Sequence, residues 1–209
     1  MQPQDIEQLS FKIIDQEAGD HRFNSKEWPI VQRMIHTSAD FEYINTIRFH
    51  PNAISAGIEA IRNGCTIITD TNMARVGIRK SELSIFGGEV KCLIADEEVA
   101  QRAKQEGITR ALAAVDKSAQ IAGKGTNSNN IYVVGNAPTA LLRIIELLKD
   151  GKIKPALIIG LPVGFVNAAE SKDELMKLDW PYISNTGRKG GSNLAASVVN
   201  ALAIMASAS

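Results

Sequence analysis

The stretch IYVVGNAPTALLRIIELLKDGKIKPALIIG, residues 131–160, carries the pattern that decides the fold. Two short apolar runs, IYVVG (131–135) and ALIIG (156–160), flank a segment that has Pro138 in its first turn and ends at Gly151. The runs are rich in β-branched residues and do not alternate, which is typical of strands buried on both faces of a parallel sheet. Proline at the start and glycine at the end indicate a helix between them. The stretch therefore predicts a strand–helix–strand unit with a right-handed crossover.

The same alternation extends over the last two-thirds of the chain. Three more apolar runs of strand length are CTIIT (65–69), VKCLIA (90–95) and PYISN (181–185). Further helical patterns are DEEVAQRAKQEG (96–107), TRALAAVDKSAQIA (109–122) and NLAASVVNALAIMA (193–206). Strands alternating with helices predict a three-layer α/β/α sandwich around a five-stranded, mainly parallel sheet. For five such strands we expect the flavodoxin-like order.

A helical extension precedes the first predicted strand. Three helical segments are expected there, at 5–19, at 25–38 with Ser25 as N-cap, and at 51–64 with Gly64 as C-cap. N-cap serine and C-cap glycine satisfy backbone groups that the helix ends leave unpaired. Without an internal repeat or a convincing linker, we expect a single domain, residues 1–209, with a helical preface (1–64) and an α/β core (65–209).

Composition narrows the class of protein. Hydrophobic residues make up 44% of the 209 residues, and 23 Lys and Arg balance 23 Asp and Glu. This balance argues against a broadly basic nucleic-acid surface, although a local basic pocket is compatible with it. No apolar run is long enough to span a bilayer, and the N-terminus does not resemble a signal peptide. Cys65 and Cys92 each lie in an apolar run, which indicates buried thiols in a reducing compartment rather than a disulfide or zinc site. We expect a cytoplasmic protein.

Ligands of open parallel sheets bind beyond the carboxyl ends of the strands. Small and polar residues follow those ends here: Thr69, Asp70, Thr71, Asn72 and Met73; Gly135, Asn136, Ala137 and Pro138; residues 160–164; and TGRKGGS (186–192). TGRKGGS lacks the spacing of a P-loop or a dinucleotide fingerprint. Its glycines precede a predicted helix, and Arg188 and Lys189 add charge, which suits a carboxylate or phosphate. A loop with two solvated cations explains the residues equally well.

Two further places carry candidate chemistry. Thr109 is a plausible helix cap, and Arg110 lies in the first turn, where a cation opposes the helix dipole unless it meets an anion. The residues alone favour a solvated arginine. His36 lies near the end of the helix predicted at 25–38, and residue physics alone favours a half-buried packing role. No second histidine, cysteine or acidic residue lies at metal-ligand spacing from His36. The sequence also contains nothing that resembles a nucleophile elbow, so a hydrolase triad cannot be argued.

Six motifs occur together and in order. They are RMIH (33–36), DTNMARVGI (70–78), TRALAA (109–114), GNAPTALLRIIELL (135–148), GLPVGFVNAAESKDEL (160–175) and GRKGGSNLAA (187–196). With them the chain resembles the precorrin-8X methylmutase family over essentially its whole length. The resemblance implies a flavodoxin-like fold and a homodimer with active sites near the subunit interface. It also implies an isomerisation in cobalamin biosynthesis, in which a methyl group migrates within ring C of a corrin precursor to give cobyrinate or hydrogenobyrinate. No methyl donor or other cofactor is needed, and cobalt, if present, belongs to the substrate.

The resemblance also assigns roles to residues. The histidine of RMIH, His36, is implied to be a general acid that donates a proton or a strong hydrogen bond to a ring nitrogen. A positioned general acid typically contributes about 10²–10⁴-fold to the rate. The residues implied to contact the macrocycle or its carboxylates are Ser10, Arg33, Thr109 and Arg110, with Asp70, Met73 and Asn136 on the same rim and Arg188 and Lys189 for further carboxylates.

Alternatives differ in class. A non-catalytic corrinoid carrier would share the binding site but not the use of His36, and a flavin protein of flavodoxin-like fold rests on fold analogy alone. The segment TSADFEY (37–43) departs from the glycine-containing segment of aerobic-pathway members, which favours the anaerobic branch and a cobalt-containing substrate. The last predicted helix, 193–206, is apolar nearly all round, and we expect it to contribute to a dimer contact.

Overall fold

The computed structural model describes residues 2–121 and 129–208. Within them one sheet has six strands, β1 (Ile47–Phe49), β2 (Thr66–Thr69), β3 (Glu89–Lys91), β4 (Asn130–Val134), β5 (Leu157–Gly160) and β6 (Tyr182–Asn185). Their order is β1-β6-β5-β4-β2-β3. All neighbouring strands are parallel except β1, which pairs antiparallel with β6. The five parallel strands, numbered along the chain, have the order 2-1-3-4-5, so the flavodoxin-like prediction is confirmed.

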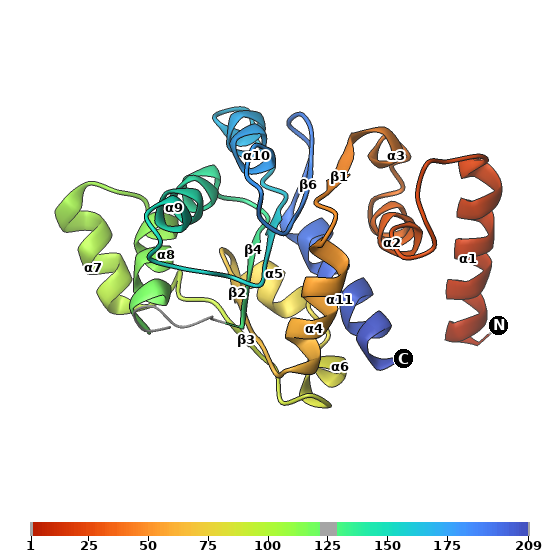
Figure 1. Cartoon of the computed structure of the whole chain (residues 1–209), viewed down its shortest axis with the longest axis horizontal. Coiled ribbons are helices and arrows are strands. Elements are labelled where there is room, and N and C mark those ends of the chain that lie inside the picture. The colour runs from red at the N-terminus through yellow and green to blue at the C-terminus, as the bar shows by residue number, and fades with distance from the viewer. Residues whose placement is uncertain (1, 122–128, 209) are drawn as a thin grey trace.

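The helices cover both faces of this sheet (Figure 1). They are α1 (Pro3–Ala18), α2 (Trp28–Ser38), α3 (Tyr43–Thr46), α4 (Ala53–Arg62), α5 (Asn72–Gly77), α6 (Lys80–Ser84), α7 (Glu97–Glu106), α8 (Arg110–Ile121), α9 (Pro138–Lys149), α10 (Ala168–Met176) and α11 (Ser192–Ser207). Residue 122, the last of the helix expected at 109–122, lies outside the described residues. None of the described helices is both long and apolar enough to pass through a membrane.

Alternate strand residues supply two separate cores. Ile131 and Val133 of β4 join the larger core, which also contains buried residues of α2, α4 and α11. Tyr132 and Val134 point to the opposite face and join the core under α8, α9 and α10. Because successive strand side chains point to opposite faces, non-alternating apolar runs are needed to fill both layers. The three-layer α/β/α sandwich predicted from those runs is confirmed.

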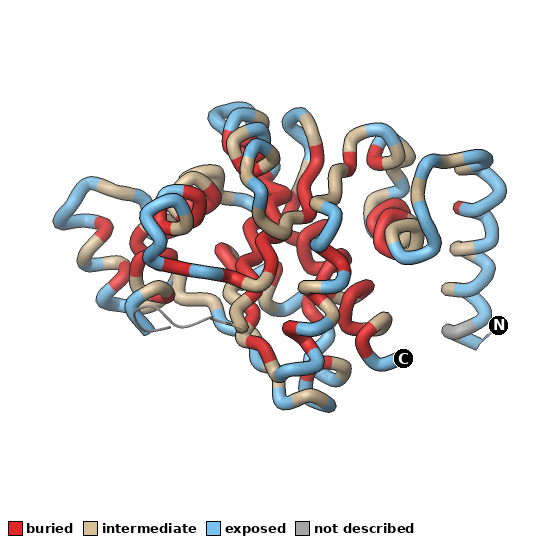
Figure 2. The backbone as a smooth tube through the Cα atoms, in the orientation of Figure 1, coloured by how far each residue is buried: buried red, intermediate tan, exposed pale blue. Residues whose placement is uncertain are grey.

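The last helix, α11, is buried within the chain itself. Eleven of its residues are buried, and α2, α4 and α5 pack against it. Figure 2 shows the buried segments gathered in the sheet and in α11, and mostly exposed ones along α1. A helix that is apolar all round can satisfy its pattern inside one domain or against a partner. Here the chain's own helices cover it, so its apolar pattern is no evidence for a dimer contact.

Outside α11 the N-terminal helices form two further layers. α2 packs against α11, and α1 packs against α2 at the edge of the molecule (Figure 1). Asp15, near the end of α1, accepts a hydrogen bond from the Trp28 ring at the start of α2. Phe11, earlier in α1, contacts His36 near the end of α2, so the two helices are antiparallel. The N-terminal half of α1 therefore lies beside the C-terminal end of α2.

Several local features differ from the sequence-based expectation. Strand β1 lies within residues 1–64, which were expected to be helical only, and it raises the strand count from five to six. It has three residues and forms by pairing with β6, so no local pattern indicates it. The predicted Ser25 cap is wrong: α2 begins at Trp28, and the Asn24 side chain accepts hydrogen bonds from the Lys26 and Glu27 amides instead.

Candidate active site

His36 lies on the exposed face of the last turn of α2. The opposite face of this helix is apolar and buries Ile30, Val31, Met34 and Ile35 against the core. A buried face with this spacing turns His36 outward, and its side chain is exposed. The helix is capped by Ala39, which adopts a left-handed conformation and donates its amide hydrogen to the Ile35 carbonyl at 2.7 Å. The imidazole is therefore available at the surface and not packed in the interior.

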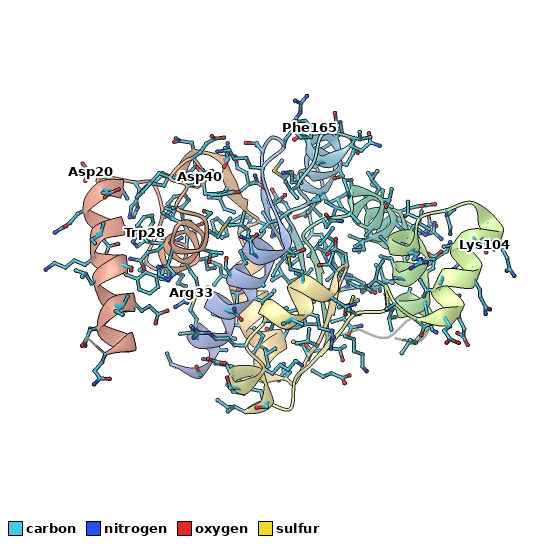
Figure 3. The ribbon with its side chains drawn as sticks, turned by 180° about the vertical axis from the view of Figure 1, so that it is seen from behind. Asp20, Trp28, Arg33, Asp40, Lys104 and Phe165 are labelled. Atoms are coloured by element: carbon cyan, nitrogen blue, oxygen red, sulfur yellow. The ribbon has the colours of Figure 1, made fainter. Side chains whose placement is uncertain are left out.

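Side chains of α1 surround this turn. The ring of Phe11 meets the His36 imidazole edge-on, with 5.1 Å between ring centroids. The Arg33 guanidinium lies 5.2 Å from the centre of the same Phe11 ring, and Arg33 Nη1 is 3.2 Å from Glu7 Oε1. Figure 3 labels Arg33 on α2, the helix that faces α1. Ser10 belongs to the same turn of α1, and its hydroxyl donates to the Ile6 carbonyl at 2.9 Å. The structure thus brings Ser10, Arg33 and His36 to one helix pair.

The end of α2 is tied to the loop that follows β6. Lys189 Nζ is 2.5 Å from Asp40 Oδ2 and 2.8 Å from Glu42 Oε2. The hydrogen bond from Lys189 lowers the pKa of Asp40, and the same bond raises the pKa of Lys189. These ion pairs place the turn after His36 at the carboxyl edge of the sheet. Lys189, expected to meet a ligand carboxylate, already holds two carboxylates of the protein.

A lysine that the sequence analysis did not single out organises this loop. Lys172 on α10 is completely buried; its ammonium donates to Asn185 Oδ1 at 3.2 Å and to the Lys189 carbonyl at 2.7 Å. Burial lowers the pKa of Lys172 to about 8. Its burial follows from its place on α10: Ala168, Ser171, Lys172 and Leu175 form one face of the helix, and all are buried. A lysine on that face weakens the amphipathic pattern by which the sequence would have indicated it.

Arg188 projects from the same loop. Its guanidinium carbon lies 5.5 Å from the centre of the Phe165 ring, and its carbonyl accepts from the Gly164 amide at 3.2 Å. Phe165 is 84% exposed and projects from the surface of the molecule (Figure 3). Arg188 is exposed and forms no ion pair with any described residue. A cation stacked on an aromatic ring at the surface remains available to an anion.

Asp70 lies at the switch point between β2 and β4, but its carboxylate faces the protein. It is buried and accepts hydrogen bonds from the amides of Gly135, Asn136 and Ala137 at 3.0, 2.8 and 2.7 Å. Burial raises the pKa of Asp70, and the amide hydrogen bonds oppose that shift. Asp70 therefore fixes the turn that begins α9, while Asn136 and the 70%-exposed Met73 present side chains at the surface.

Thr109 and Arg110 begin α8 in the helical layer opposite α2. The Thr109 hydroxyl accepts from the Leu112 amide at 3.2 Å, as a cap does, and lies 2.9 Å from the Thr139 hydroxyl near the start of α9. Arg110 is exposed and has no ion pair among residues 2–121 and 129–208. This pair and Asn136 share the carboxyl edge of the sheet, across the sheet from His36.

Comparisons with known proteins identify the family. The family model for precorrin-8X methylmutase matches residues 5–205. The chain belongs to the precorrin-8X methylmutase family. A cobalt-precorrin-8 methylmutase from Priestia megaterium is 50% identical over 206 residues, covering 99% of this chain and 89% of that protein. A solved structure described as precorrin-8X methyl mutase from Thermus thermophilus has a TM-score of 0.90 and 45% identity and covers 98% of this chain and 97% of its own.

Relatives with either name align over nearly the full length. A cobalt-precorrin-8 methylmutase from Salmonella typhimurium is 45% identical and covers 96% of this chain and 94% of its own. A precorrin-8X methylmutase from Sinorhizobium sp. is 38% identical and covers 95% and 92%. This methylmutase is an isomerase of cobalamin biosynthesis, and the predicted enzyme class is confirmed. Among the described residues, no group of three or more His, Cys, Asp or Glu side chains is placed to hold a metal ion.

Proposed function

We propose that this methylmutase converts cobalt-precorrin-8 into cobyrinate, with His36 as the proton donor. The observation that carries the assignment is the placement of His36: an exposed imidazole on the last turn of α2, flanked by Phe11 and Arg33. Relatives with cobalt in their names reach 50% identity, whereas the precorrin-8X methylmutase from Sinorhizobium sp. is 38% identical and the Thermus thermophilus structure described as precorrin-8X methyl mutase is 45% identical. These names and the TSADFEY segment both support the cobalt-containing substrate.

The reaction requires that a proton be donated to the substrate and afterwards taken back. A migrating methyl group leaves one ring carbon with its bonding electron pair and bonds to the adjacent carbon, so substrate and product have the same atoms. Protonation or strong hydrogen bonding at a ring nitrogen draws electron density from the conjugated system and lowers the barrier to this shift. An imidazole can act as a general acid and as a general base, so the same side chain can donate that proton and take it back. We expect no external methyl donor or resident cofactor.

Cations at the carboxyl edge would meet the acetate and propionate arms. Arg110 and Arg188 are exposed and free of ion pairs among the described residues, which makes them the candidates for direct contact with carboxylates. Asn136 and Met73 would line the same edge. Asp70 would act through the Gly135–Ala137 turn and not by contact, because its oxygens already accept three amide hydrogen bonds.

We further propose a homodimer that uses the outer face of α1. Ile6, Leu9 and Ile13 are 52%, 46% and 44% exposed, and their i, i+3, i+7 spacing places them on one stripe. The other apolar face of α1, with Phe11 and Ile14, packs against α2. An interface on α1 would lie next to His36. The mass in solution tests this: Leu9→Lys should shift a dimer toward monomer, and a monomeric wild type at micromolar concentration would refute it.

The decisive test compares wild type, His36→Asn and Thr37→Ala. Each is incubated with cobalt-loaded and metal-free precorrin-8, and conversion is followed by absorbance. His36→Asn should lose about 10²–10⁴-fold in turnover. Its stability should change by less than about 0.5 kcal/mol, because the side chain is exposed. Thr37→Ala, on the same turn, should convert normally. A wild type that binds corrinoid and never rearranges the methyl would instead indicate a carrier.

The cytoplasmic location stays a prediction. It is supported by the two cysteines, which are unpaired in the structure. Cys65 is buried, and burial raises the pKa of its thiol to about 12, so this thiol is protonated and unreactive at neutral pH.

A further inference from the structure

Three charged side chains from separate elements meet beside His36. Glu7 Oε1 of α1 lies 3.2 Å from Arg33 Nη1 of α2 and 4.0 Å from Nη2 of Arg79, which follows α5. The Arg33 side chain is 14% exposed, that of Glu7 38% and that of Arg79 49%. One carboxylate oxygen is therefore shared by two guanidinium groups, of which one is largely buried and the other opens to solvent.

Arg79 is held in this position by α11. Its backbone amide donates to Asn200 Oδ1 at 2.8 Å, and Asn200 Nδ2 donates to the Gly77 carbonyl at 2.9 Å. Gly77 also permits close packing, because a Cβ there would lie 3.0 Å from the Ala196 Cβ. The turn that carries Arg79 is thus fixed on both sides. Its guanidinium has a second acid, Glu82, at 3.7 Å, whereas the only ion pair of Arg33 within the described chain is with Glu7.

The position held by the Glu7 carboxylate is close to the proposed proton donor. Arg33 and His36 are three residues apart on α2 and therefore neighbours on one helical face. The Phe11 ring touches both of them. Any anion that replaced the Glu7 carboxylate would keep Arg33 paired and would lie within about one helical turn of the imidazole.

We propose that Arg33 and Arg79 form a subsite for a carboxylate arm of the corrinoid, and that Glu7 occupies this subsite until the arm displaces it. This inference rests on the function proposed above and adds Arg79 and Glu7 to the site. Exchange of one carboxylate for another avoids leaving the largely buried Arg33 unpaired, which would be strongly unfavourable. An ester or amide arm carries no charge and cannot compete with Glu7. The subsite therefore selects the free acid over its neutral derivatives.

Equilibrium binding of cobyrinate tests the subsite. Wild type, Glu7→Gln, Arg79→Gln and the matched control Glu82→Gln are titrated with cobyrinate and with its fully esterified form. Arg79→Gln should weaken cobyrinate binding about ten-fold or more, since a charged hydrogen bond is lost. Glu7→Gln should tighten it several-fold by removing the competitor. Glu82→Gln removes the other carboxylate that pairs with Arg79, and it should change cobyrinate binding less than Glu7→Gln does. Ester binding should not respond to any of the three substitutions.

Two further measurements separate the explanations. In the Glu7→Gln, Arg79→Gln double variant the gain from Glu7→Gln should be smaller than in the Glu7→Gln single variant, because only Arg33 remains to hold the arm. Circular dichroism checks that α1 remains folded. If Glu7→Gln weakens cobyrinate binding as Arg79→Gln does, Glu7 is a scaffold for the arginines and the proposal is wrong. Normal conversion with an unchanged KM in Arg79→Gln would refute the subsite and leave the methylmutase function standing. If the predicted binding pattern is found but wild type converts no substrate, the subsite stands and the proposed function is refuted.

Discussion

Replacing the buried Lys172 by methionine should change how stability depends on pH. The ammonium is enclosed between α10 and the loop after β6, with Asn185 Oδ1 and the Lys189 carbonyl as its hydrogen-bond acceptors. Both acceptors are neutral. Desolvation therefore dominates and lowers the pKa of Lys172 from its usual 10.5 to about 8, while the nearby Asp173 opposes the shift. Methionine has nearly the same length and no charge.

The sign of the effect follows from proton binding. Between pH 8 and 10.5 the unfolded chain binds the Lys172 proton and the folded chain has lost it, so stability rises with pH in this window. Below pH 8 both states are protonated and the full penalty applies, about 3 kcal/mol at 1.36 kcal/mol per pKa unit. Above pH 10.5 the penalty vanishes. The free energy of unfolding of wild type minus that of Lys172→Met should therefore increase by about 2–3 kcal/mol from pH 7 to pH 10.

Urea unfolding at several pH values between 7 and 10 measures this difference. Groups common to both proteins cancel, so the slope isolates Lys172. The offset at neutral pH is not diagnostic, because the lost hydrogen bonds, about 1.5–3 kcal/mol each, oppose the relief of desolvation. Lys177→Met, directly after the same helix but exposed and paired with Glu174, should show no comparable slope. A flat difference for Lys172→Met would mean that the ammonium is well solvated, and the burial argument would fail.

Two further substitutions test the turns at the carboxyl edge. Asp70→Asn should lower the free energy of unfolding by about 1–3 kcal/mol, because its NH₂ group would face a backbone amide donor; denaturant unfolding measures this, and unchanged stability would contradict the role given to Asp70. Gly190→Ala should cost at least about 1–3 kcal/mol, because its Cβ would lie 2.2 Å from the Leu161 carbonyl oxygen and 2.8 Å from that of Pro162; a wild-type melting temperature would show that these loops can separate.

The parallel sheet could be predicted because its signals are local. The strand at 131–135 and the helix at 137–151 were placed within two residues of β4 and α9, since apolar runs, proline and glycine act within a few residues. Strand β1 and helix α10 gave no such signal. β1 depends on pairing with β6, and α10 buries Lys172 on its apolar face, which weakens the amphipathic pattern that would reveal it.

The candidate site was only partly accessible to sequence reasoning. The spacing of Arg33 and His36 on one helix follows from sequence, and so does the outward direction of His36 once the apolar positions are assigned. The partners of the cations do not. Asp40 and Lys189 are 149 residues apart in sequence and 2.5 Å apart in space. Glu7 and Arg79 meet only because α1 packs on α2 and Asn200 fixes the turn after α5.

These partners divide the cations of the site into two kinds. Lys189 joins the turn after α2 to the loop after β6 through two acids, so giving up those acids would break the link between that loop and the end of α2 next to His36. Arg33 has Glu7 as its ion-pair partner, on a helix whose packing against α2 also involves Phe11, Ile14 and Asp15. Loss of that one pair leaves the other α1 contacts in place. A protein with equal numbers of acidic and basic residues can therefore bind a polycarboxylate if one of its own carboxylates can leave its cation without loosening the fold. The structure identifies Glu7 as that carboxylate.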